Sequence, residues 1–146
     1  MRDPIILIKK NYHSRTKLNS SIVLVLWPNN LRPENYEEIL LWKQMRSLCR
    51  QFGLNEKRII AIKNLKSRAD FSQCLELTDV YLDALINTEL VSVVQSILVG
   101  VTPVIRYSET SRGRQIPALV KELELPELIV HTEKEYMNLS VELATS

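Results

Sequence analysis

Glycine, histidine and cysteine are scarce in this chain of 146 residues, which has three glycines, two histidines and two cysteines. So few glycines leave no G-x-G-x-x-G motif and no Walker loop, which excludes the usual glycine-rich phosphate cradles. The two cysteines cannot build a disulfide framework, and with two isolated histidines they show no zinc-ligand spacing. No serine lies in a G-x-S-x-G nucleophile elbow. We therefore expect no bound metal, and we identify no catalytic residue.

Long apolar runs are absent as well. Residues 22–27 and 90–101 form the longest uncharged runs, and they are too short or too interrupted by polar residues to cross a bilayer. No basic start followed by an apolar block and a small-residue cleavage site marks the chain for export. With 45% apolar and 25% charged residues, the sequence predicts one soluble, cytoplasmic domain without a membrane partner.

Charge is nearly balanced overall but unevenly distributed. The formal net charge of +2 gives no reason to expect a polyanionic partner, and we expect no nucleic acid. Residues 46–68 nevertheless contain seven basic side chains against Glu56, whereas residues 121–142 contain six glutamates against two lysines. The contrast is typical of solvated helix surfaces that differ in sign, and a built anion site is the alternative.

Short apolar runs rich in β-branched residues alternate with segments of helical spacing. The runs are typical of buried strands and lie near residues 22–26, 58–62, 79–83, 103–106 and 128–130. Apolar residues recur every three or four positions from Tyr36 to Phe52, which predicts a helix that Gly53 ends. Each further run is also followed by a segment that we expect to be helical.

Two of the later helices have clear end signals. Residues 90–99 are apolar on most sides, as in a helix buried against a sheet, and Gly100 ends this segment. Thr132 with Glu135 forms a capping box for the last helix. Pro33 and Pro117 lie near predicted helix starts and are interpreted as structural punctuation.

This alternation predicts an α/β fold with a Rossmann-like parallel sheet and helices on both faces. Residues 5–8 add a strand ahead of a polar loop. We therefore divide the chain into an N-terminal strand and loop, residues 1–20, and a Rossmann-like domain, residues 21–146.

The loops after the strands are the informative ones, because ligands of open parallel sheets bind beyond the carboxyl ends of the strands. One such loop carries Lys66 and Arg68, and the loop over residues 106–114 carries Arg112 and Arg114. An anion held between these loops is one hypothesis. His131 also follows a strand, but a lone histidine without a partner signature is more often a surface residue than a catalytic one.

Six segments in a fixed order carry a resemblance to a known family. They read R-I-I at Arg58, L-T-D-V-Y-L-D at Leu77, G-V-T-P-V-I at Gly100, S-E-T-S-R-G-R at Ser108, L-E-L-P-E-L-I at Leu123 and E-K-E-Y-M-N-L-S-V-E-L-A-T-S at Glu133. With S-I-V-L-V-L-W at Ser21 before them, they resemble the C-terminal, donor-binding half of the O-linked N-acetylglucosamine transferase family, which includes the SPINDLY-type proteins. The resemblance covers roughly the last 125 residues.

The resemblance implies a GT-B type architecture, of which this chain forms the half that faces a UDP-sugar donor. The histidine usually assigned to the family's chemistry belongs to the other half. We therefore expect no catalysis by this chain alone, and any activity of a completed protein would be that of a UDP-sugar glycosyltransferase.

The same resemblance places the donor diphosphate at a helix start, where the family has N-G-H-T-T and then an aspartate. The corresponding residues here are Thr88, Glu89, Leu90, Val91 and Ser92, followed by Gln95. Ser92 keeps a hydroxyl, Gln95 is positioned for a ribose hydroxyl and Arg68 retains a cation, so these three are the candidate cofactor-binding residues. Glu89 brings a carboxylate to the diphosphate, and two unit charges about 4 Å apart repel by about 4 kcal/mol at an effective dielectric of about 20. We expect this degenerate site to bind UDP weakly or not at all.

Three functions follow from these observations. The first is a noncatalytic interaction or scaffold module for a protein partner or a second copy. Its contact surface would be apolar and contain Leu85, Ile86, Leu90 and Val91, and the alternative is that these side chains fold inward and extend the core. The second is the UDP-sugar-binding half of an active glycosyltransferase completed by a partner or a missing domain. The third is an unrelated anion-binding domain that uses the four cations of the two basic loops, Lys66, Arg68, Arg112 and Arg114.

Overall fold

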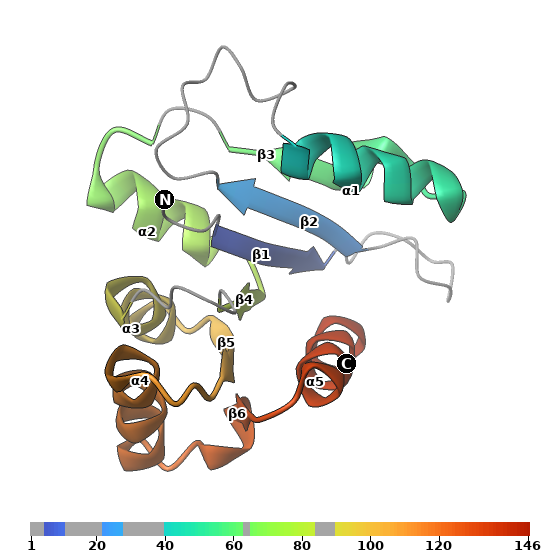
Figure 1. Cartoon of the computed structure of the whole chain (residues 1–146). Coiled ribbons are helices and arrows are strands. Elements are labelled where there is room, and N and C mark those ends of the chain that lie inside the picture. Colours follow the sequence, from blue (N-terminus) through green and yellow to red (C-terminus); the bar gives the residue numbers. More distant parts are fainter. Residues whose placement is uncertain (1–4, 11–21, 28–39, 63–64, 84–89) are drawn as a thin grey trace.

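The computed structural model describes residues 5–10, 22–27, 40–62, 65–83 and 90–146 (Figure 1). The predicted helix over residues 36–52 is described from residue 40 onward. The elements in chain order, with η marking 3-10 turns, are β1 (Ile5–Lys10), β2 (Ile22–Trp27), α1 (Leu40–Gln51), η2 (Glu56–Arg58), β3 (Ile59–Ala61), α2 (Arg68–Glu76), β4 (Val80–Leu82), α3 (Leu90–Leu98), β5 (Thr102–Arg106), α4 (Ser111–Glu122), η3 (Pro126–Leu128), β6 (Ile129–Val130) and α5 (Glu133–Thr145).

The strands form one sheet in the order β3-β2-β1-β4-β5-β6. β2 pairs with β3 in parallel, and β5 pairs in parallel with β4 through its first half and with β6 through its second half. The five strands predicted from the apolar runs therefore share one direction, and a helix follows each of them. The predicted fold class, a Rossmann-like α/β sheet, is confirmed.

β1 runs against all the other strands and lies in the middle of the sheet. It pairs antiparallel with β2 over its whole length, from Ile5 opposite Trp27 to Lys10 opposite Ile22, and antiparallel with β4 on its other side. The N-terminal strand expected over residues 5–8 is therefore present, and it joins two parallel groups of strands into one sheet.

Two helical layers cover the sheet, with α2, α3 and α4 on one side and α1 and α5 on the other (Figure 1). On one face Val25, Tyr81 and Ile105 pack with Phe71 of α2 and with buried residues of α3 and α4. On the opposite face two smaller clusters contain Val80, Val104, Val130 and Ala144 beside α5, and Leu26, Cys49 and Ile59 beside α1. Because successive side chains of a strand point to opposite faces of the sheet, one face packs on α2, α3 and α4 and the other on α1 and α5. None of the helices in the described ranges has the length and apolar character that a membrane span requires.

Three helices end with the same backbone motif. Beyond α1, the Gly53 N–H donates to Arg50 and the Leu54 N–H to Cys49, and Gly53 has φ +64°. Gly100, with φ +80°, repeats this arrangement after α3. These are Schellman ends, in which a left-handed residue turns the chain so that orphan carbonyls are paired. The predicted stops at Gly53 and Gly100 are confirmed, and the end of α4 places Glu124, with φ 60°, at the same position.

The helix starts confirm one prediction and correct another. Thr132 and Glu135 form the predicted capping box of α5. The segment from Ser111 is helical, however, and Pro117 lies buried inside α4 instead of near its start. Thr110 caps this helix by accepting a hydrogen bond from the Gly113 N–H at 3.0 Å. A Cβ at position 113 would lie 2.3 Å from the Ser108 side chain, so the close approach at this helix start requires glycine. The helix begins at Ser111, six residues before Pro117.

Candidate functional site

The direction of winding reverses between β2 and β4. The β2–α1–β3 connection lies on one face of the sheet and the β4–α3–β5 connection on the other, with β1 between them. In open α/β sheets ligands bind at the carboxyl ends of the strands beside such a switch point. The described residues at this edge therefore define the candidate site. Four residues of the predicted donor segment or its apolar surface, Leu85, Ile86, Thr88 and Glu89, lie outside the described residues.

The end of β2 contributes an aromatic contact. The ring centroids of Trp27 and Phe71 lie 4.7 Å apart with their planes tilted by 33°. Phe71 is buried in the larger core cluster, and Trp27 packs against that cluster from the sheet edge. The apolar run over residues 22–26 predicted the strand, but the contact of Trp27 with α2 depends on the fold.

The end of β4 contributes a buried acid. Asp83 is 1% exposed, its main-chain N–H donates to the Val104 carbonyl, and its main-chain carbonyl accepts a hydrogen bond from the Tyr136 hydroxyl at 2.7 Å. Burial and, secondarily, the charge of Asp83 raise the pKa of Tyr136 well above its ordinary value. This hydrogen bond attaches α5 to the residue that follows β4. The position of Asp83 in its apolar run did not indicate this contact.

Arg68 and Gln95, two of the three predicted donor-binding residues, lie together. The Gln95 side-chain amide donates to the Arg68 main-chain carbonyl at 3.3 Å and to the Ser72 hydroxyl. Arg68 is the first residue of α2, and its side chain is exposed. The amide nitrogen of Gln95 therefore joins α3 to the first turns of α2.

Ser92, the third predicted residue, is 5% exposed and lies near the start of α3. Ser96, one turn later on the same side of the helix, is completely buried, and its hydroxyl donates to the Val93 carbonyl at 2.7 Å. Small side chains at both positions line the inner side of α3. Burial of Ser92 leaves its hydroxyl little access to a ligand at the sheet edge.

The two basic segments do not form a single cluster of loops. Lys66 and Arg68 are exposed at the start of α2, where Ser67 caps the helix and the Asp70 carboxylate accepts from the main chain of Lys66 and Ser67. Arg112 and Arg114 belong to the start of α4 and not to a loop. α3 contacts both α2 and α4 and lies between them in Figure 1. The two segments share one edge of the sheet but are separated by a helix.

Two side-chain contacts lie beyond β5 and β6. The rings of Tyr107 and His131 are 5.1 Å apart, and the Arg106 guanidinium lies 3.5 Å from the Glu133 carboxylate. Main-chain N–H groups of His131 and Thr132 donate to Glu135 and lower its pKa. These contacts organise the start of α5. Among the residues that the structure describes, no group of histidine, cysteine and acidic side chains is arranged to hold a metal ion.

The outer side of α3 is apolar and exposed. Leu90 is 39% exposed, Val91 49% and Leu98 79%, and α3 contains no charged residue. Residues at these positions cluster on one side of a helix because each turn takes 3.6 residues. The sequence left two alternatives for Leu90 and Val91, an apolar surface or an extension of the core, and their exposure favours the surface. Leu98 extends it by two turns, and its helical spacing from Val91 would have indicated this.

The comparisons with known proteins concern the fold. No family model and no curated protein matches the chain. Among solved structures, a mutant O-GlcNAc transferase from Thermobaculum terrenum matches with a TM-score of 0.62 and 24% sequence identity. The match covers 71% of this chain and 20% of that one, so the chain spans only about a fifth of the transferase. The chain therefore has the Rossmann-like fold found in a GT-B glycosyltransferase.

Proposed function

We propose that this domain is a degenerate relative of the donor-binding half of O-linked N-acetylglucosamine transferases and acts as a noncatalytic interaction module. The observation that carries the proposal is the uncharged, exposed outer side of α3, formed by Leu90, Val91 and Leu98. Exposed apolar surfaces of this kind mark protein contacts when they are contiguous. A second copy of the chain is the partner to test first.

The state of the predicted donor residues supports a role without UDP-sugar. The Gln95 amide bonds to α2, and Ser92 is buried. Both residues therefore take part in packing α3 into the fold. The competing function, a donor half that an additional domain completes, draws its support from the fold of the matching transferase.

Self-association tests the interaction surface. We expect analytical ultracentrifugation to show a concentration-dependent dimer that Leu90→Ser with Val91→Ser removes, while the melting temperature changes by no more than about 2 °C. Val141→Ser is the matched control, because Val141 is 61% exposed on α5, in the opposite helical layer. A monomeric wild-type chain at high concentration, or equal dimerisation of all variants, contradicts a homotypic contact through α3.

Calorimetry with UDP and UDP-N-acetylglucosamine tests the competing function. We expect no heat of binding or a weak one. Low-micromolar binding, on the order of −8 kcal/mol, would show that the domain retains the donor site. Arg68→Gln should then reduce that binding, because Arg68 is the exposed cation among the three candidate residues.

A further inference from the structure

Two short turns beyond α1 return the chain alongside the last turns of the helix. Gly53 ends α1 in the Schellman arrangement, and Asn55 then caps η2 by accepting a hydrogen bond from the Lys57 N–H at 2.9 Å. Two successive capped turns leave Glu56 beside the helix that the chain has just left. Its position is therefore set by main-chain geometry.

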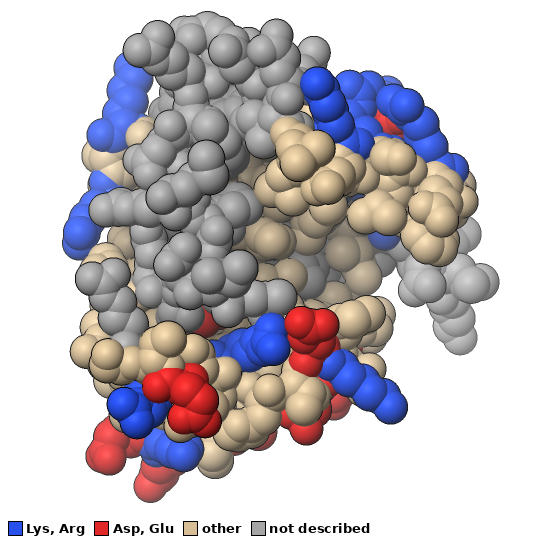
Figure 2. All heavy atoms as spheres, in the orientation of Figure 1, with Lys and Arg blue, Asp and Glu red and all other residues tan. Residues whose placement is uncertain are grey.

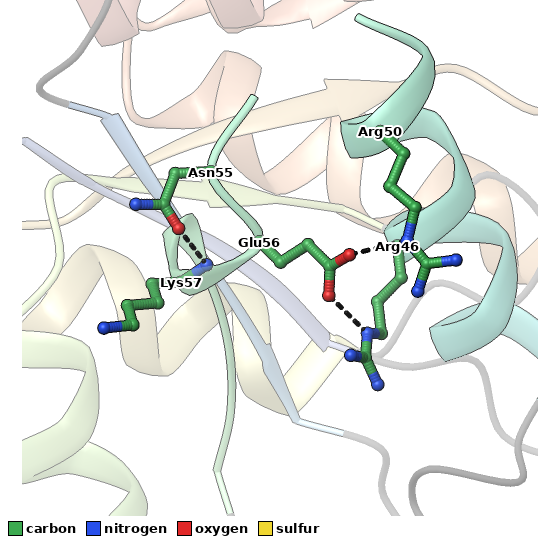
Figure 3. A network of polar contacts seen from close by, with 5 residues as sticks. All are labelled: Arg46, Arg50, Asn55, Glu56 and Lys57. Carbon is green, nitrogen blue, oxygen red and sulfur yellow. Dashed lines mark hydrogen bonds and ion pairs between the residues drawn. The ribbon is translucent and has the colours of Figure 1, made fainter. Parts of the chain in front are cut away.

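Glu56 bridges two arginines of α1 (Figure 3). One carboxylate oxygen accepts from Arg46 Nε at 2.6 Å and the other from Arg50 Nε at 2.7 Å. The two arginines are four residues apart and so lie on the same side of the helix. These bonds, Arg50 first and Arg46 second, hold the pKa of Glu56 below its ordinary value.

The terminal nitrogens of both guanidinium groups point away from the Glu56 carboxylate (Figure 3). The side chains of Arg46 and Arg50 are 40% and 67% exposed. Within the described residues, their only hydrogen bonds use Nε. A guanidinium has five N–H donors in a planar fork that matches phosphate oxygens, so each arginine retains donors for a ligand.

The outer side of α1 around Glu56 is positively charged. Lys43 is exposed one turn before Arg46 on the same side of α1, so this side of the helix has three cations, two of which bond to the carboxylate of Glu56. Two positive charges remain uncompensated within this group. In Figure 2 the basic atoms gather at the place of α1, with little red among them.

We infer that Arg46 and Arg50, which Glu56 holds in place, bind a phosphate monoester dianion together with Lys43. Two guanidinium forks on neighbouring turns can donate to different oxygens of one tetrahedral group, and the two uncompensated charges match its charge. Three cations on one helix are too few for the extended backbone of a nucleic acid, which rewards many phosphate contacts. The site lies on the face of the sheet opposite α3 and is independent of the proposed interaction surface.

An NMR titration of the whole chain with inorganic phosphate, at constant ionic strength, tests the inference. We expect saturable shifts of the Arg46 and Arg50 Nε–H signals and of main-chain amides 50–57. Arg46→Gln and Arg50→Gln should each weaken binding at least about tenfold, since each removes a charged fork. Arg50→Lys keeps the charge but loses the fork, and should also weaken it. The matched control, Lys121→Gln, changes an exposed cation in the last turn of α4 and should leave binding unchanged.

Two further ligands identify the source of the phosphate group. Equal binding of inorganic phosphate, glycerol 3-phosphate and a phosphoserine tripeptide supports a site for phosphate alone, and tighter binding of the tripeptide assigns the site to a phosphorylated protein. Shifts that never saturate and spread over all surface cations would overturn the inference. So would unchanged affinity in a folded Arg46→Gln/Arg50→Gln variant, because the arginines would then serve only to hold η2 against α1.

Discussion

α1 and α3 occupy comparable places in the fold and differ on their outer sides. Each follows a parallel strand, contributes buried residues to a core cluster and ends in a Schellman turn at a glycine with positive φ. Outside, α1 carries the Lys43, Arg46 and Arg50 cations, whereas α3 carries only uncharged side chains. The fold thus fixes the inner side and the end of a helix, and leaves the outer side to determine what the surface can bind.

The largest expected effect separates the inner from the outer side of α3. Val93 is completely buried, so Val93→Ser should lower the free energy of unfolding by about 3 kcal/mol through the lost apolar contact and the buried hydroxyl. Val91→Ser, at an exposed position, should change it by no more than about 0.5 kcal/mol. Urea unfolding of both variants measures the difference. Equal losses would mean that Val91 belongs to the core.

The shared helix ends predict equal costs for two glycine substitutions. Gly53→Ala and Gly100→Ala should each destabilise the chain by about 1–2 kcal/mol, because a Cβ is strained in the left-handed region. No other atom lies within 4 Å of the new Cβ at either position, so backbone strain is the whole expected effect. Thermal unfolding gives the comparison, and a much larger loss at one site would show that the two ends are not equivalent.

α4 ends in the same way without a glycine, which predicts a stabilising substitution. Glu124 has φ 60° at the position that Gly53 and Gly100 hold in the other helices. Glu124→Gly should raise the free energy of unfolding by about 1 kcal/mol, since glycine adopts this conformation without strain. Ala118→Gly is the control at an exposed position inside the helix, and it should destabilise by a similar amount. A loss at Glu124 would contradict the shared helix end.

The smallest expected effect is on the stability of the folded chain at low pH. Because Arg50 and Arg46 lower the pKa of Glu56, the charged carboxylate stabilises the folded state above the ordinary carboxyl value of 4.5, and this contribution is lost as the pH falls through the lowered native value. Glu56→Gln should therefore flatten the acid dependence of the melting temperature in that range. Glu142→Gln, an exposed glutamate on α5, serves as the control and should follow the wild type. If the melting temperatures of wild type and Glu56→Gln fall equally as the pH is lowered, the stabilising contact of Glu56 with Arg46 and Arg50 is contradicted.

The parallel strands were predictable because their signal is local. A run such as residues 103–105 is apolar on both sides, as a strand covered by two helical layers must be, and the capping residues Gly100 and Thr132 mark the neighbouring helix ends. The direction of β1 was not predicted, since an apolar run is the same in either direction. A signal was available, because residues 11–21 contain no helical pattern for the crossover that a parallel neighbour of β2 would need.

The candidate site was less predictable because side-chain access depends on packing. The resemblance selected Arg68, Ser92 and Gln95 by position, and position cannot show that Ser92 is buried or that the Gln95 amide bonds to α2. Their role in binding a donor remains a prediction. The basic segment around Glu56 was visible as a charge contrast, but its bridge arises from two turns that bring residues 46, 50 and 56 together.

The central, antiparallel strand β1 makes unfolding of the two halves of the sheet interdependent. β2 and β3 on one side, and β4, β5 and β6 on the other, are joined in the sheet through the backbone hydrogen bonds of β1. Opening of β1 would divide the sheet into two groups of strands, each with its own helices. Amide hydrogens of β1 should then exchange no faster than those of the core strands beside it, because exposing them requires the two groups to separate.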